Sequence, residues 1–268
     1  MAKVTEAIQN FRASEDLSQK NTWLNRLHPV VNLVSTLLYI VTVTSFDRCD
    51  ISGLLPMVFY PVILLAVSGF PMGFFIKRLL VVLPLIVLIG VFNPLFDRVP
   101  VVFGNAAVAR GWITFLSVVL KSVFTVFAAT LLTASAGIDN TAYALRTLKV
   151  PKILVLQLLL TYRYISVLLD EFRHILLSYS LRAPNQKGIH HSAWGSLTGQ
   201  FLLRAFDKAG QVYNAMRLRG FAGEYHTGRK RQVQLFDMVY LFVWAAFFFA
   251  ARFINLSELL YHIYNIVG

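Results

Sequence analysis

The sequence predicts an all-α integral membrane protein with about five transmembrane helices and long cytoplasmic amphipathic helices. Of its 268 residues, 57% are hydrophobic and 14% are charged, and the mean hydropathy is +0.62. Soluble domains have about a quarter of their residues charged, so a soluble chain of this composition could not shield its apolar side chains from water. The aromatic content of 14% is typical of helix interfaces and of the headgroup regions of a bilayer.

Five apolar segments are each close to the roughly 20 residues that cross a bilayer core. They cover residues 30–46, 51–67, 79–96, 112–136 and 235–254. Pro56, Pro61 and Pro84 lie inside the second and third segments. Neighbouring helices can satisfy the carbonyl groups that a proline frees, so these residues predict kinks rather than helix ends.

Lysine and arginine predict the orientation, because they accumulate in cytoplasmic loops. Residues 137–232 hold 14 of the 25 basic residues, and residues 1–29 hold four. This asymmetry also explains the net charge of +12 without a nucleic-acid partner. The predicted organisation is a cytoplasmic N-terminal segment (1–29), a four-span region (30–136), a cytoplasmic insert (137–232), and a final span with an external C-terminal tail (233–268).

The insert begins with residues 153–169, which are apolar enough to be a sixth span. Helical spacing nevertheless separates two faces, as in a helix that lies on a surface. The polar face carries Arg163, Ser166, Asp170 and His174, and the apolar face carries Tyr164, Ile165, Leu168, Phe172, Ile175 and Tyr179. Spanning would also move the arginine-rich stretch that follows to the outside. We expect a helix at or just below the inner membrane surface; a helix that dips into the bilayer is the alternative.

A second amphipathic helix is predicted at about residues 194–219. Its apolar side chains recur at steps of three and four: Trp194, Leu197, Phe201, Ala205, Ala209, Val212 and Met216. Gly220 directly follows and predicts the C-cap. Pro184 and Gly188, with the polar residues between them, predict the turn that separates the two helices.

Residues suited to catalysis or metal binding are scattered. Side chains of the adjacent His190 and His191 diverge on a helix, so a solvated turn is favoured over a metal site. The single cysteine, Cys49, excludes an internal disulfide, and no GxxxxGK[ST] phosphate loop is present. Lys121 lies well inside the fourth span, where it either has an interior partner or reaches the membrane surface. We therefore predict a chain that is not an enzyme and that binds no metal or cofactor.

Two arginine triplets are the candidate functional site. Leu181-Arg182-Ala183 ends the first amphipathic helix and Leu218-Arg219-Gly220 ends the second. One such arginine can simply complement the helix dipole. The same arrangement at both helix ends indicates guanidinium groups offered to a soluble partner, since arginine forms forked hydrogen bonds to carboxylates and carbonyls.

Three further stretches are distinctive: residues 148–152 (LKVPK), 159–165 (LLTYRYI) with Asp170-Glu171, and 213–221 (YNAMRLRGF). In these stretches, and in the order of its spans and amphipathic helices, the chain resembles the transmembrane coupling subunit, or T component, of energy-coupling factor (ECF) transporters, and within it the cobalt-type CbiQ-like branch. In that family two X-Arg-X motifs dock into a pair of ATP-binding cassette ATPases, which implies Arg182 and Arg219 here. The first triplet has Ala183 where the family often has glycine.

The resemblance implies a subunit that transmits ATPase movement to a separate substrate-binding membrane subunit. It implies a multi-pass protein of the prokaryotic inner membrane, with ATP used by the partners. The cargo implied is cobalt or nickel, and a vitamin-type T component is the alternative. A membrane-embedded enzyme and a secondary carrier are the rivals; the first needs converging polar groups, and the second usually has paired inverted halves. Small residues expected to approach the membrane partner closely are Gly90, Ala128, Ala129, Ala134 and Ala136.

Overall fold

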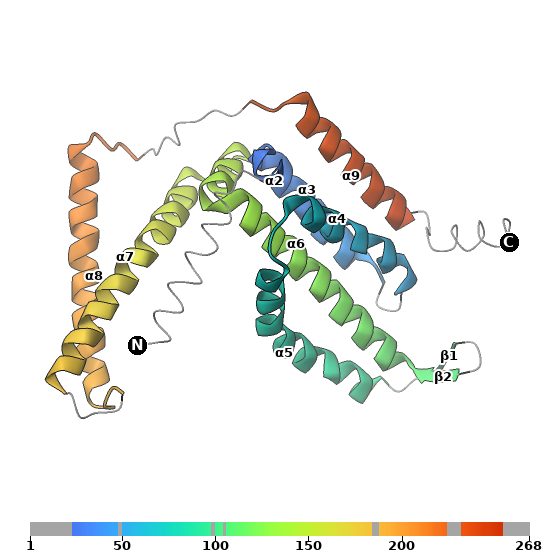
Figure 1. Cartoon of the computed structure of the whole chain (residues 1–268), viewed down its shortest axis with the longest axis horizontal. Helices are drawn as coiled ribbons and strands as arrows, with labels where there is room; N and C mark the ends of the chain where they lie inside the picture. The colour runs from blue at the N-terminus through green and yellow to red at the C-terminus, as the bar shows by residue number, and fades with distance from the viewer. Residues whose placement is uncertain are drawn as a thin grey trace. The chain divides into compact units, whose positions relative to one another are not determined.

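A computed structural model describes residues 23–47, 50–97, 100–103, 106–183, 188–223 and 232–253 of the chain. These residues are almost entirely helical, which confirms the all-α fold class (Figure 1). The elements are α2 (Trp23–Arg26), α3 (Pro29–Ser45), η1 (Ser52–Val58), α4 (Phe59–Ser68), α5 (Met72–Phe96), β1 (Pro100–Phe103), β2 (Ala106–Ala109), α6 (Arg110–Thr147), α7 (Lys152–Arg182), α8 (Ala193–Leu218) and α9 (Leu235–Phe253). The short antiparallel hairpin β1–β2 was not expected, and it forms in a valine-rich stretch between two spans.

Among the described residues, α5, α6, α7 and α9 are long and apolar enough to cross a membrane. The expected spans 30–46 and 51–67 correspond to α3 and to η1 with α4, which are shorter apolar helices. At 1.5 Å per residue the 17 residues of α3 are about 26 Å long, near the lower limit for a bilayer core. The third span starts earlier than expected, at Met72, and α6 extends past the predicted end at residue 136.

The chain divides into two compact units. One contains the described residues 23–137 and 232–253, and the other contains residues 138–223. The boundary falls inside α6 at Gly137, whose backbone angles (φ 65°, ψ 175°) are not helical. This region of backbone space is essentially restricted to glycine, so α6 is two helical segments joined at a residue that a side chain would strain.

Gly137→Ala is therefore expected to destabilise the protein by about 1–3 kcal/mol, the usual cost of such a backbone conformation for a residue with a Cβ. Thermal unfolding in mild detergent measures the effect. Gly73→Ala on α5 is the control, since a Cβ there meets no atom within 4 Å. Equal stability of the two variants would contradict the account of Gly137.

The core of the first unit is aromatic. Tyr39 of α3 stacks on Tyr60 of α4 with ring centroids 4.5 Å apart, and Phe248 of α9 packs against both rings. The Tyr39 hydroxyl donates a hydrogen bond to the Met57 carbonyl, at 3.0 Å, which satisfies its only donor in the core. The core thus joins α3, η1, α4 and α9, although α9 follows in sequence by about two hundred residues, and it also includes residues of α2, α5 and α6.

Helices α3 and α9 run parallel, as contacts between their first turns and between their last turns show. At the start, the buried carboxylate of Asp237 accepts hydrogen bonds from the backbone N–H of His28, at 3.0 Å, and of Gln234, at 2.9 Å. At the end, the Arg252 guanidinium donates to the Ser45 carbonyl, at 3.2 Å, and lies over the Phe46 ring. Two parallel spans must be separated by an odd number of other spans.

Lys121 of α6 has its hydrogen-bond partners at the end of α3 rather than in the interior of a span. Its ammonium group donates hydrogen bonds to the carbonyls of Phe46, at 2.6 Å, and Asp47, at 3.2 Å. These carbonyls follow the last turn of α3, where helix carbonyls lack partners and the helix dipole favours a cation. Near the other end of α3, Asn32 donates to the Ser135 hydroxyl at 2.8 Å, so α6 runs antiparallel to α3.

Most of the small residues expected to face a membrane partner are instead buried against other helices of this chain, which corrects that expectation. Ala128 and Ala134 lie in the core, and Ala136 is also buried. A Cβ on Gly90 would lie 2.7 Å from the Phe115 ring, so this glycine allows α5 and α6 to approach each other. Only Ala129 of the five is exposed. The cause is that small residues also serve packing between helices of one chain.

Candidate functional site

Helices α7 and α8 pack as an antiparallel pair. Near the connecting turn, the His190 backbone N–H donates to the Tyr179 hydroxyl at 3.2 Å. Further along, Phe172 and Phe201 meet edge to face with ring centroids 5.4 Å apart. Ile175 and Leu197 are the buried residues on the same side. Beyond these contacts the two helices diverge (Figure 1).

The exposure pattern supports the predicted apolar faces, and the predicted polar face of α7 only in part. All six residues of the predicted apolar face of α7 are buried or half-buried. On its predicted polar face Arg163 and His174 are exposed, whereas Ser166 and Asp170 are half-buried. On α8 the predicted stripe is likewise the less exposed side, except that Trp194 and Ala209 are exposed. These faces supply the apolar contacts through which the α7–α8 pair forms.

Arg182 is the last residue of α7, and its side chain is exposed. The Ala183 backbone N–H donates to the Tyr179 carbonyl at 3.1 Å, which ends the helix without a glycine. The neighbouring Leu181 is 73% exposed. The first triplet therefore presents one apolar and one cationic side chain together; residues 184–187 of the predicted turn lie outside the described residues.

Arg219 is the C-cap of α8, and Gly220 after it has a positive φ of 77°, which confirms the predicted cap. The Phe221 N–H donates to the Met216 carbonyl and the Gly220 N–H to the Arg217 carbonyl, both at 3.0 Å. This is the Schellman pattern, which fixes the chain direction at a helix end. Arg219 is exposed, and Leu218 is 90% exposed, so the second triplet offers the same pair of groups.

Gly220→Ala should lower the free energy of unfolding by about 1 kcal/mol or more, because a Cβ strains the left-handed cap. It should also weaken binding of the expected ATPase partner, because Arg219 loses its fixed position. Gly210→Ala, in the interior of the same helix, should instead be neutral or slightly stabilising, since a Cβ there meets no atom within 4 Å. Affinity for the partner and thermal stability check both variants. Equal behaviour of the two would show that the cap does not position Arg219.

The structure does not bring the two arginines together. In the antiparallel pair the C-terminal ends of α7 and α8 point in opposite directions, and α8 alone has 26 residues. At 1.5 Å per residue, Arg182 and Arg219 are separated by roughly 30–40 Å along the pair. One small groove cannot hold both guanidinium groups, so the arrangement fits two separate binding sites.

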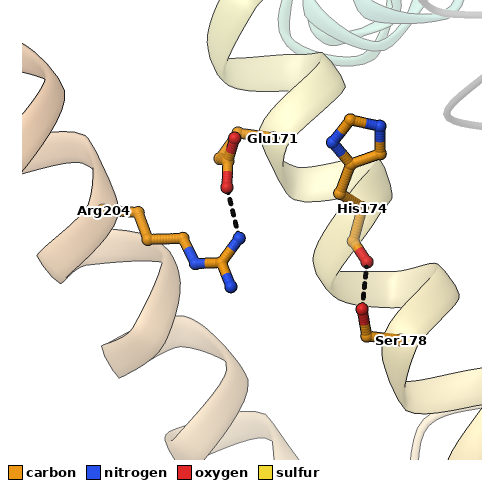
Figure 2. Close-up of polar contacts among 4 residues, drawn as sticks. All are labelled: Glu171, His174, Ser178 and Arg204. Atoms are coloured by element: carbon orange, nitrogen blue, oxygen red, sulfur yellow. Dashed lines mark hydrogen bonds and ion pairs between the residues drawn. The ribbon is translucent and has the colours of Figure 1, made fainter.

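Between the two triplets, Glu171 of α7 forms an ion pair with Arg204 of α8 (Figure 2). Figure 2 shows the Glu171 carboxylate pointing toward α8, whereas the His174 ring points away from it. Hydrogen bonding from the Arg204 guanidinium holds the pKa of the Glu171 carboxyl below its usual range. The carboxylate therefore stays charged at neutral pH and remains a partner for Arg204.

A shallow pocket of about 290 Å³ lies beside this ion pair. Glu171 and Asp207 balance the charges of Arg204 and Lys208 in its wall. Such a mixed wall selects neither an anion nor a cation. In the part of the chain that the structure describes, no three His, Cys, Asp or Glu residues gather at metal-binding distance. His190 lies in the exposed turn before α8, where its ring nitrogen contacts the Ser192 hydroxyl at 2.7 Å.

Sequence reasoning missed two features of this unit. The pairing of Glu171 with Arg204 had a signal, since both residues lie on predicted amphipathic helices joined by a turn. The turn between α6 and α7 had a signal in Pro151. It contains Lys149 at a positive φ of 64°, and the Val150 N–H donates to the Leu145 carbonyl at 3.1 Å. The stretch LKVPK is thus a second Schellman-type helix end.

Comparison with known proteins agrees with this architecture. An uncharacterised protein of Methanocaldococcus jannaschii is 25% identical over 191 residues, which is 67% of this chain and 65% of that relative. The chain therefore aligns with just under two thirds of the relative's length. A family model described as cobalt transport protein, CbiQ, matches residues 20–231, from before α2 to beyond α8. Because that match covers most of the chain and the helices can cross a membrane, this multi-pass membrane protein belongs to the CbiQ cobalt transport family.

Proposed function

We propose that this chain is the transmembrane coupling subunit of an ECF-type importer of cobalt. In this proposal it transmits conformational changes of two ATP-binding cassette ATPases to a separate substrate-binding membrane subunit, with or without a small accessory membrane subunit. Membership of a cobalt transport family supports the cargo. The coupling role goes beyond the family description, and it rests on the two arginine triplets.

The observation that carries the proposal is the position of Arg182 and Arg219 at opposite ends of the α7–α8 pair. Both are exposed and both end a helix of more than 25 residues. Such helices are stiff levers, so a displacement at one end moves the rest as a rigid body. Two arginines on one lever suit two copies of a soluble partner that move relative to each other.

The chain itself is proposed to be non-catalytic. Its sequence lacks the Gly-rich phosphate loop of ATPases, and cofactor or metal binding is assigned to the partners. ATP hydrolysis is therefore proposed to occur only in the ATPase subunits. The membrane-embedded enzyme remains the rival, and it predicts turnover by the purified chain alone.

The proposed topology has five spans, with the N-terminus in the cytoplasm and the C-terminus outside. The parallel arrangement of α3 and α9 supports an odd number of spans. If α3, α4, α5, α6 and α9 cross the bilayer, a crossing by α7 alone would make α9 antiparallel to α3. The length and composition of α7 would allow it to cross the bilayer. The argument against such a crossing is therefore the parallel direction of α3 and α9. The protein is proposed to lie in the prokaryotic inner membrane.

Purification of the tagged chain in mild detergent tests the function. Two ATPase subunits and a membrane subunit should co-purify, and labelled cobalt should be taken up only when all are present. Uptake of nickel or of a vitamin by the same complex would reassign the cargo. Purification without any ATPase, from cells that express the partners, would contradict the coupling role.

A further inference from the structure

The contact between α7 and α8 changes character along its length. Near the turn the helices are packed, through Tyr179 with His190 and Phe172 with Phe201. One residue beyond Phe172 lies the ion pair of Glu171 with Arg204. Past that pair, the facing residues line the 290 Å³ pocket instead of filling the space. The ion pair therefore lies at the boundary between the packed part of the α7–α8 pair and the pocket.

A directional contact at the point where two helices diverge constrains the angle between them. Arg219 lies 15 residues beyond Arg204, which is about 22 Å of helix, so a rotation of about 10° at the ion pair displaces Arg219 by about 4 Å. Arg182 lies on the other side of the contact, eleven residues beyond Glu171, and about 16 Å of helix separates them. Because the two arginines lie on opposite sides of the ion pair, such a rotation changes the distance between them little and instead moves Arg219 sideways relative to α7 and Arg182.

The chemistry of the pair suits an orienting role more than a stabilising one. The side chains of Arg204 and Glu171 are 44% and 35% exposed, and ion pairs with such exposure add little to stability. The planar guanidinium nevertheless prefers a defined approach to a carboxylate, which the aromatic contact beside it does not impose. The charge of Lys208, one turn further along α8, also contributes to lowering the pKa of the Glu171 carboxyl.

We infer that Glu171 and Arg204 are positioning residues that clamp α7 and α8 at one angle, and so fix the direction in which α8 extends and the position of Arg219 relative to Arg182. The clamp itself follows from the α7–α8 contacts alone. Its use in coupling rests on the proposed function, because the relative position of the two triplets matters only when two ATPases bind them. Loss of the clamp should leave the chain folded and able to bind ATPases, while uptake per ATP hydrolysed falls severalfold.

Spin labels on exposed Leu158 of α7 and Tyr213 of α8, which both lie on the diverging side of the ion pair, measure the angle, in the full chain reconstituted in lipid nanodiscs with Cys49→Ser as background. The clamped protein should give one narrow distance distribution. Glu171→Gln and Arg204→Gln should each broaden it, and the exchanged pair Glu171→Arg with Arg204→Glu should restore it. Lys208→Gln is the matched control and should leave it narrow.

A distribution as narrow in both single variants as in the parent would overturn the clamp, and so would an exchanged pair that stays as broad as the single variants. The coupling readout is separate. In the assembled transporter, the single variants should capture ATPases normally with reduced uptake per ATP, and the exchanged pair should recover uptake. A broadened distribution in a protein that never captures ATPases would sustain the clamp and reject the proposed function, so the two failures are distinguishable.

Discussion

Replacing both Arg182 and Arg219 with alanine is expected to abolish ATPase capture and uptake while the chain stays inserted and folded. Each arginine is proposed to make forked, partly buried hydrogen bonds to an ATPase. Removing one partner of such a contact costs on the order of 2–5 kcal/mol, because the other group is left unpaired. Since about 1.4 kcal/mol is a factor of ten, each single variant should weaken binding by at least roughly 30-fold.

Pull-down of the ATPases and uptake, measured in parallel, check this result. Lysine at either position should rescue only in part, because an ammonium group cannot reproduce the planar fork. Arg173→Ala, exposed in the middle of α7, and Arg217→Ala, whose guanidinium lies 5.8 Å from the Tyr213 ring, are matched controls. Arg229→Ala is a further control in the basic run before α9, outside the described residues. If the double variant captured the ATPases at the wild-type level, Arg182 and Arg219 would only complement the helix dipoles and would not bind the ATPases.

The second large effect is expected at Asp237, which joins the starts of α3 and α9. The residue is 5% exposed, and its carboxylate accepts two backbone hydrogen bonds, from His28 and Gln234. Hydrogen bonds to charged groups contribute about 1.5–3 kcal/mol each, so Asp237→Ala should destabilise the protein by about 3 kcal/mol or more. Asp237→Asn should lose less, because one acceptor oxygen remains.

Thermal stability in detergent, followed by size-exclusion chromatography, measures this difference. Asp139→Ala, at an exposed position of α6, is the control and should change stability little. An Asp237→Ala variant as stable as that control would show that the hydrogen bonds to Asp237 do not hold α3 and α9 together.

The fold class was predictable because apolar segments of near 20 residues have few alternatives to membrane helices. The amphipathic faces of α7 and α8 followed from spacing in the same way. The roles of charged residues inside the membrane were harder to predict from the sequence. Lys121 could be placed in the fourth span from sequence, but its partners are carbonyl groups beyond α3, which leave no side-chain signature.

The arrangement of the candidate site was beyond sequence reasoning for a similar reason. Both triplets could be found as helix ends, and Gly220 as a cap. Their separation to opposite ends of one pair depends on α7 and α8 packing antiparallel, which depends in turn on which residues meet across the interface. The pairing of Glu171 with Arg204 selects that register, and two predicted amphipathic faces alone allow several.

Photo-crosslinking from the exposed neighbours of the two arginines tests the central claim most directly. A photoreactive residue at Leu181 or at Leu218, which are 73% and 90% exposed, is introduced into the assembled complex. Phe206 on α8, also exposed, serves as the comparison position away from the triplets. The account predicts that both triplet positions crosslink to an ATPase subunit and that Phe206 does not. Crosslinking of neither triplet position to an ATPase, in a complex that is intact and active, would contradict it.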